Sequence, residues 1–183
     1  EKGYDAVSIR TITRAVGIKE SSFYNHFTSK SALLDEIFQL MENNLKRLKP
    51  DTDEIDRLTD ELTLGEYLKR GLDRFMQNWN QPVAAQIWSV VSMEQYRNHR
   101  AARLIIEESE RVMKQLSTAF LFFQQKRKMK EGDPMLLAHL YGFSIRAIHL
   151  DYTLRSFGNL DPSYSLNKVY RTMELFAQNW QTD

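Results

Sequence analysis

The sequence predicts an all-α fold, and three observations carry this prediction. Apolar residues recur at intervals of three and four along almost the whole chain of 183 residues. No stretch shows the sustained alternation of apolar and polar residues that is typical of a strand. Serine, aspartate, proline and glycine interrupt the pattern at points that suit helix ends. We therefore expect a series of helices joined by short turns.

Two short helices and a longer third one are predicted at the N-terminal end. Ser8 is a favourable N-cap for a helix over 9–16, and Gly17 supplies a turn because glycine tolerates positive φ at little cost. A second helix is predicted from about Lys19 to Phe27, and a third from Lys30 to about Leu48. This succession is the outline of a helix-turn-helix, the motif that places its second helix in the major groove of DNA.

The clearest break in the pattern is the segment KPDTDE over residues 49–54, which combines a proline with charges and has no apolar residue. We expect a domain boundary there, with a helix-turn-helix domain over 1–48 and a second helical domain over 49–183.

Three helices are predicted next. Thr63 and Glu66 form a capping box for the first of them. Pro82 suits the first turn of the second, which is apolar nearly all round and is therefore expected to be buried. The third is long, from about Arg100 to Lys130, and its basic end KRKMK suits a helix C-terminus.

The last two helices, over about 134–157 and 162–181, each begin with an Asp-Pro pair. Together they carry more apolar surface than one chain needs for its own core. A homodimer with twofold symmetry, built from these helices as a four-helix bundle, is the simplest closed arrangement that covers it.

Composition narrows the function classes. The formal net charge is only +1, so any positive potential for nucleic acid must be local. The absence of cysteine excludes disulfides, cysteine-type zinc sites and thiol catalysis. The four histidines form no metal-ligand pattern. We find no signal peptide and no apolar run long enough to span a bilayer, so we expect a cytoplasmic protein without a membrane partner, metal or cofactor.

The chain begins at Glu1 without a methionine, and the run EKGY places Gly3 where a helix C-cap belongs. We therefore expect a further helix before residue 1 in the native protein.

The run GYDAVSIRTITRAVGIKESSFYNHFTSKSALL, residues 3–34, resembles the TetR family of bacterial transcriptional regulators. The shared pattern is a glycine, a helix capped by serine or threonine, a glycine turn, a Tyr-x-His-Phe helix end and a Ser-Lys opening of the next helix. The resemblance covers about the first fifth of the chain. It implies binding to double-stranded DNA through the helix-turn-helix, and a helical C-terminal domain that binds a small effector and forms a dimer.

The resemblance also implies roles for individual residues at the DNA. Backbone contacts would come from the first helix cap, from Tyr24 and His26, and from the start of the third helix, while the exposed face of the second helix would reach base edges in the major groove. The family often has a small hydroxyl residue where this chain has Lys19, which leaves the capping of that helix open and offers a phosphate contact instead. The implied DNA-binding residues are Ser8, Arg10, Lys19, Glu20, Ser21, Ser22, Tyr24, Asn25, His26 and Lys30.

Aromatic and methionine side chains in the second domain are suitable lining for an adaptable apolar pocket, although an aromatic stripe at helical spacing is more often core. Arg146 lies in an apolar stretch, where it could bind a carboxylate of the effector or form a salt bridge with Glu94 or Asp151. The candidate pocket residues are Tyr67, Phe75, Trp79, Trp88, Met93, Tyr96, Phe120, Phe123, Tyr141 and Arg146.

These observations predict a homodimeric repressor that a small effector releases from a near-palindromic operator. One alternative is a regulator of the same fold that senses no small molecule and is controlled by a protein or acts constitutively. A helical enzyme is the remote alternative, since no glycine-rich phosphate loop, nucleophile elbow, H-E-x-x-H motif or convincing acid pair is present. No catalytic residue is therefore assigned.

Overall fold

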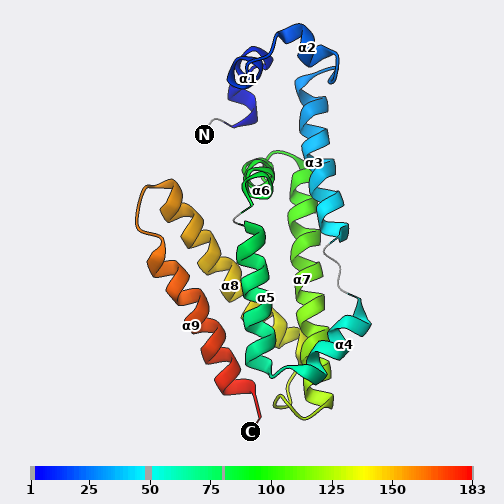
Figure 1. The fold of residues 1–183 in the computed structure, drawn as a ribbon, viewed down its shortest axis with the longest axis vertical. Coiled ribbons are helices and arrows are strands. Elements are labelled where there is room, and N and C mark those ends of the chain that lie inside the picture. Colours follow the sequence, from blue (N-terminus) through cyan, green and yellow to red (C-terminus); the bar gives the residue numbers. More distant parts are fainter. Residues whose placement is uncertain (1–2, 48–50, 80, 183) are drawn as a thin grey trace. The chain divides into compact units, whose positions relative to one another are not determined.

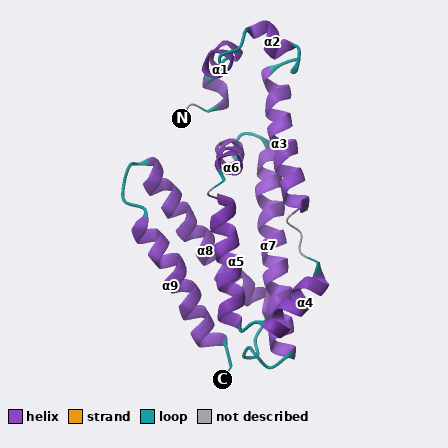
Figure 2. Ribbon diagram, in the orientation of Figure 1, coloured by secondary structure: helices purple, strands orange, loops and turns teal. Residues whose placement is uncertain are grey.

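The computed structural model describes residues 3–47, 51–79 and 81–182 (Figure 1). Within these ranges the chain is helical and contains no strand, which confirms the all-α prediction (Figure 2). None of the described helices has the length and apolarity needed to cross a membrane. In chain order the helices are η1 (Tyr4–Ala6), α1 (Ile9–Val16), α2 (Glu20–Tyr24), α3 (Lys30–Arg47), α4 (Thr52–Glu61), α5 (Leu64–Trp79), α6 (Pro82–Glu94), α7 (His99–Gln125), α8 (Pro134–Phe157) and α9 (Ser163–Trp180).

The chain forms two compact units. The N-terminal unit comprises residues 1–49 and 78–108, and the C-terminal unit comprises residues 50–77 and 109–183. One passage between the units lies at residues 49–50, near the expected domain boundary, which stays a prediction. The N-terminal unit also contains α6 and the beginning of α7, which the sequence did not associate with the helix-turn-helix.

The core of the N-terminal unit lies where α3 packs against α6 and the first turns of α7. Apolar residues of these helices recur at helical spacing, so each helix turns one apolar stripe toward the others. Its buried members are Leu34, Phe38, Met41, Ile87, Val91, Ala101 and Leu104.

The core of the C-terminal unit joins α5, the second half of α7, α8 and α9. The α8–α9 pair runs antiparallel within this unit (Figure 1). Asp151 of α8 links the two helices by accepting a hydrogen bond from Ser165 of α9. The buried core residues are Leu64, Leu68, Leu72, Phe120, Phe123, Met129, Leu137, Ala138, Tyr141, Val169, Met173 and Ala177.

Helix α4 begins inside the segment that the sequence predicted to be a break. Asp51 caps it by accepting from the amide of Asp53 at 3.4 Å, and Ile55 and Leu58 are buried. The expected break over 49–54 is therefore too long, because its charges lie on the exposed side of a short helix. Residues 48–50 lie outside the described part of the chain.

Helix α7 ends at Gln125, so the basic run KRKMK lies beyond the helix and does not continue it to Lys130 as expected. Instead the run forms a turn that binds the C-terminal end of α4. The ammonium group of Lys128 donates to the carbonyl oxygens of Thr59 at 2.9 Å and Leu62 at 3.3 Å. The cations thus stabilise a helix C-terminus as predicted, but that of another helix.

The predicted caps are mostly confirmed. Glu66 accepts from the amide of Thr63 at 2.8 Å and completes the capping box at α5. Asp133 caps α8 by accepting from two amides of its first turn. At α9 the expected register is wrong by one residue, since Pro162 is the N-cap and the helix starts at Ser163.

Candidate nucleic-acid interface

The helix-turn-helix is built by local capping and by an aromatic pair of which Phe23 is buried and Phe27 half-buried. The hydroxyl of Ser8 accepts from the amide of Thr11 at 3.1 Å, which caps α1. Gly17 adopts φ of +73°, the left-handed conformation that ends α1 and turns the chain into α2. The rings of Phe23 and Phe27 lie 5.3 Å apart, and Phe23 is buried. Helices α1 and α2 pack against each other across this turn.

The residues expected to reach DNA from α2 lie on its open side. Tyr24 is 55% exposed while its ring makes an edge contact with Phe23 at 5.6 Å between centroids. Ser22 is half-buried. Lys19 is the N-cap residue of α2 and makes no side-chain capping bond. The exposed members of the expected set on and around this helix are Lys19, Glu20, Ser21, Tyr24, Asn25 and His26.

The first helix adds positive charge to this end of the molecule. Arg10 and Arg14 are exposed on α1, and Lys19 is exposed just before α2. Glu20 is the acidic residue in the first turn of α2. The motif therefore presents cations around short polar side chains, which suits phosphate contacts around a base-reading helix.

Lys30 has a role inside the protein that the sequence did not reveal. Its ammonium group donates to the carbonyl oxygens of Tyr4 at 2.7 Å and Val7 at 2.9 Å. It also lies 4.0 Å from the centroid of the Tyr4 ring. Lys30, at the start of α3, therefore fastens the segment that leads into α1, whether or not it also contacts phosphate.

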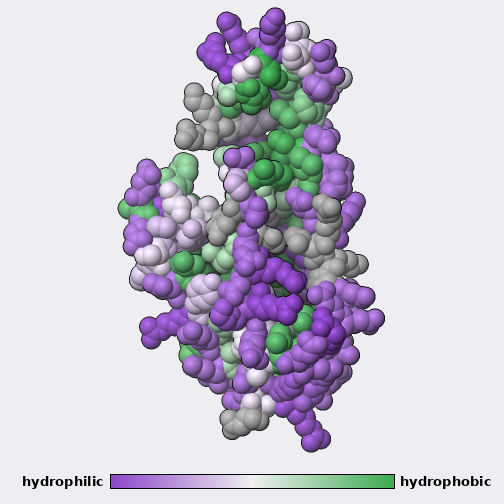
Figure 3. Space-filling model, viewed as in Figure 1, coloured by the Kyte–Doolittle hydropathy of each residue, from purple (hydrophilic) through white to green (hydrophobic). Residues whose placement is uncertain are grey.

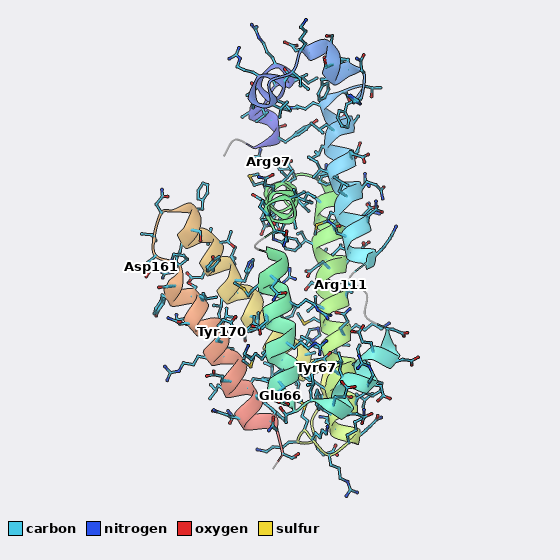
Figure 4. All side chains as sticks on the ribbon, in the orientation of Figure 1. Glu66, Tyr67, Arg97, Arg111, Asp161 and Tyr170 are labelled. Atoms are coloured by element: carbon cyan, nitrogen blue, oxygen red, sulfur yellow. The ribbon has the colours of Figure 1, made fainter. Side chains whose placement is uncertain are left out.

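Residues at the end of α6 hold the segment that precedes the helix-turn-helix. Glu94, buried at the end of α6, accepts from the amide of Tyr4 at 3.3 Å. Arg97, in the turn after α6, pairs with Asp5 at 3.3 Å (Figure 4). Since Tyr4 precedes α1, this end of α6 bears directly on the position of the motif.

Helix α7 holds α3 through one arginine. Arg100 contacts Glu42 at 2.8 Å and Asp35 at 3.2 Å. Both carboxylates lie on α3, so the guanidinium fixes that helix against the first turn of α7.

Comparison with known sequences identifies the N-terminal segment. Residues 1–37 match the family described as "Bacterial regulatory proteins, tetR family". This match confirms the predicted resemblance to the TetR family over the first 37 residues of the chain. The matched residues contain η1, α1 and α2, the same segment whose caps, glycine turn and exposed polar residues are described above. No curated protein matches the chain.

Solved structures of transcriptional regulators share the fold. A TetR-family regulator from Mesorhizobium loti is 18% identical, covering 99% of this chain and 90% of that one, with a TM-score of 0.63. The complex of SmeT from Stenotrophomonas maltophilia with triclosan is 11% identical, with coverage of 98% and 84% and a TM-score of 0.65. A transcriptional regulator from Saccharomonospora viridis in complex with choline is 17% identical, with coverage of 100% and 91% and a TM-score of 0.57.

The expected effector residues are divided between the two units. Trp88, Met93 and Tyr96 belong to the N-terminal unit, where Trp88 packs on the core and Tyr96 is 91% exposed. The side chain of Trp79 lies outside the described residues. The remaining candidates are in the C-terminal unit: Tyr67, Phe75, Phe120, Phe123, Tyr141 and Arg146.

The aromatic candidates of the C-terminal unit are mostly core. Phe120 and Phe123 are fully buried, and the ring of Tyr67 makes an edge contact with Phe123 at 5.5 Å. Burial raises the pKa of Tyr67 to about 12 and also raises the pKa of Tyr141. These side chains therefore fill the space between α5, α7, α8 and α9, and only a rearrangement of that packing would expose them to a ligand.

Sequence reasoning missed His149, which lies beside the expected candidate Phe75 at 5.0 Å between ring centroids. Burial, and secondly the positive charge of Arg146, lowers the pKa of His149 to about 4. Its position on the inner side of α8 was a signal that could have found it. The expected acids near Arg146 have other contacts, because Glu94 accepts from Tyr4 and Asp151 pairs with Arg155 at 3.0 Å.

A concavity of about 410 Å³ lies along α5, and hydrophilic side chains cover this helix in Figure 3. Glu66, at the lower end of α5 in this view, is labelled in Figure 4. The lining of the concavity is polar and charged, unlike the aromatic pocket expected from the sequence: Glu66, Lys69, Arg70, Asp73, Arg74 and Gln77. Within the part of the chain that the structure describes, no group of histidine and acidic residues could hold a metal ion.

Proposed function

We propose that this protein is a TetR-family repressor that binds an operator through α1 and α2 and is released by a small effector. The observation that carries the proposal is the exposed face of α2, where polar side chains surround the buried Phe23. TetR-family proteins are DNA-binding regulators without enzymatic activity, so the match of residues 1–37 to that family supports a regulator over the helical enzyme. The proposed setting is the bacterial cytoplasm.

The proposed contacts follow from exposure and chemistry. Glu20, Ser21 and Asn25 offer acceptors and donors for base edges in the major groove, and exposure leaves them available. Tyr24 and Arg10 would contact the phosphate backbone, which fixes the orientation of α2 without reading sequence. We expect half-sites spaced by roughly 34–36 Å on the operator if two copies bind together.

A dimer is part of the proposal, and exposed apolar side chains support it. On α8 and α9 these include Leu140, Phe157 and Leu175, each more than half exposed. A second copy that covers α8 and α9 would remove this surface from water, as the sequence prediction of a four-helix bundle requires.

The contacts around Tyr4 supply a route from an effector to the DNA-binding helices. Glu94 belongs to α6 and holds the Tyr4 amide, while Lys30 holds the Tyr4 carbonyl. A ligand that shifts the end of α6 would therefore move the entry to α1. By linkage, that ligand must bind more weakly to the DNA-bound form.

The related structures with triclosan and choline support a small organic effector, although neither compound is assigned to this chain. The dense aromatic core around Phe120 and Phe123 favours the second candidate, a regulator of the same fold without a small-molecule ligand. The two candidate functions differ in whether the aromatic core can open to admit a ligand. The core is the place to ask this, because the concavity along α5 is polar.

Selection of binding sites from a random duplex pool tests the DNA-binding proposal. We expect an inverted repeat whose binding weakens with salt. Asn25→Ala should change the selected bases, whereas Arg14→Ala on α1 should weaken binding to every sequence alike. Failure to enrich any sequence with folded protein would refute operator binding.

With an operator in hand, a compound library tests the effector. Release of operator by one chemical class supports the repressor with an effector. If every compound that binds the protein leaves operator affinity unchanged, the constitutive or protein-controlled alternative is favoured.

A further inference from the structure

The charged concavity along α5 combines carboxylates that have partners in the protein with guanidinium groups that have none there. Its volume of about 410 Å³ falls in the range of small-molecule sites, which begins at about 300 Å³. Its lining carries three cations, two carboxylates and one amide, on a helix that hydrophilic side chains cover in Figure 3. The partners of these groups decide what the concavity can bind.

Both carboxylates of the lining accept hydrogen bonds from neighbouring donors. Oε2 of Glu66 accepts from the amide and the hydroxyl of Thr63, each at 2.8 Å. Oδ2 of Asp73 accepts from Lys69 at 2.6 Å, and Oδ1 accepts at 3.1 Å from the hydroxyl of Tyr170, which is labelled in Figure 4. The hydrogen bonds from Thr63 lower the pKa of Glu66, and the one from Lys69 lowers the pKa of Asp73. Both carboxylates therefore stay ionised at neutral pH with their partners inside the protein.

Two guanidinium groups remain in the concavity. Arg70 and Arg74 are exposed, and within the described part of the chain neither forms an ion pair or a side-chain hydrogen bond. They lie four residues apart on one face of α5, a spacing at which like charges destabilise a helix. Burial raises the pKa of Tyr67 and the positive charge of Arg74 opposes this rise, so that guanidinium lies beside the edge of the core. An anion between the two arginines would replace their repulsion with attraction.

We propose that this concavity binds the phosphate group of a small phosphorylated molecule between Arg70 and Arg74, with Gln77 contacting the rest of that molecule. A phosphate ester offers three acceptor oxygens that point in different directions, so it can serve two arginine forks, whereas a carboxylate offers two oxygens in one plane. The concavity also exceeds the space that a phosphate ion needs, since a water molecule takes roughly 30 Å³. The site lies apart from the aromatic core and requires no change in operator affinity, so it goes beyond the proposed function.

Isothermal titration calorimetry on the full chain, in a buffer without phosphate, tests the site. The probes are glucose 6-phosphate, adenosine monophosphate and inorganic phosphate. We expect saturable binding of at least one ester, tighter than that of inorganic phosphate and weaker at higher salt.

Paired variants locate the binding. Arg70→Gln combined with Arg74→Gln should weaken ester binding at least about tenfold, because the charge-assisted hydrogen bonds to phosphate are lost. The matched control is Arg103→Gln combined with Arg171→Gln, which removes the same charge from two exposed positions outside α5. It should change the affinity by less than about twofold. Circular dichroism confirms that both double variants fold.

Arg74→Lys separates a site built from arginine forks from general attraction to a basic surface. Lysine keeps the charge but lacks the planar fork, so this variant should bind the ester at least about threefold more weakly than the wild type. Equal affinity of the variant and the wild type would overturn the proposed geometry.

Three further results would count against the site. Absence of saturable binding with every probe, or equal losses in the two double variants, overturns the proposal. Binding of a poly-glutamate peptide but of no phosphorylated probe also overturns it and assigns this face to an acidic protein partner. Inorganic phosphate that binds as tightly as both esters overturns the contact with Gln77. Operator binding is measured separately by site selection, so failure here leaves the proposed function standing.

Discussion

Replacing Lys30 with methionine should loosen the segment before α1. The substitution removes the two hydrogen bonds to the carbonyl oxygens of Tyr4 and Val7 and the contact with the Tyr4 ring, but keeps most of the aliphatic volume. A hydrogen bond to a charged group contributes about 1.5–3 kcal/mol when well buried. Because Lys30 is only half-buried, we expect about 2 kcal/mol for all three contacts together.

Hydrogen exchange measures this loss locally. A change of about 2 kcal/mol corresponds to roughly thirtyfold faster exchange in the segment that opens. The amides of Ala6 and Val7 report it, since they donate to Gly3 and Tyr4 within η1. Lys19→Met removes the same charge from an exposed side chain without a capping bond and should leave exchange unchanged. Equal exchange in the wild type and in Lys30→Met would refute the reasoning.

Three further predictions concern single side chains. Ser8→Ala should cost about 1 kcal/mol through loss of the α1 cap and lower operator affinity, which melting and binding curves would measure together. Lys128→Ala should lower the melting temperature by several degrees, through about 1–2 kcal/mol, because it exposes the carbonyl end of α4. Since the folded-state pKa of His149 is about 4 and the unfolded value is 6.5, the unfolded chain binds the proton first as pH falls. Stability should therefore decline by roughly 3 kcal/mol between pH 6.5 and 4. His149→Phe should flatten this part of the pH curve, and an unchanged curve would show that the imidazole is already protonated or solvated.

Features that depend on neighbouring residues were predictable from the sequence. Ser8, Gly17 and the Thr63–Glu66 box each act on the backbone within four residues, so their chemistry specifies the local structure. The match of residues 1–37 to the TetR family rests on the same local signals. The individual DNA contacts stay predictions.

Features that depend on contacts between residues far apart in the sequence were not predictable. The sequence indicates that Phe120 and Trp88 face inward, but periodicity does not say which core each helix joins. The same limit explains Lys30 and Lys128, which resemble surface cations in the sequence and bind backbone carbonyls in the structure. Helix α4 was not predicted, because charged residues outnumber its few apolar ones.

The lysine contacts at the end of α4 also bear on the order of folding. They join residues 66 to 70 positions apart, whereas the bond between Asp151 and Ser165 that links α8 to α9 spans only 14. Closing the longer loop costs more chain entropy before any contact compensates for it. We expect the α8–α9 hairpin to gain amide protection early in pulse-labelled refolding and α4 to gain it last. A newly synthesised chain would then hold α4 loosely until the turn after α7 is complete.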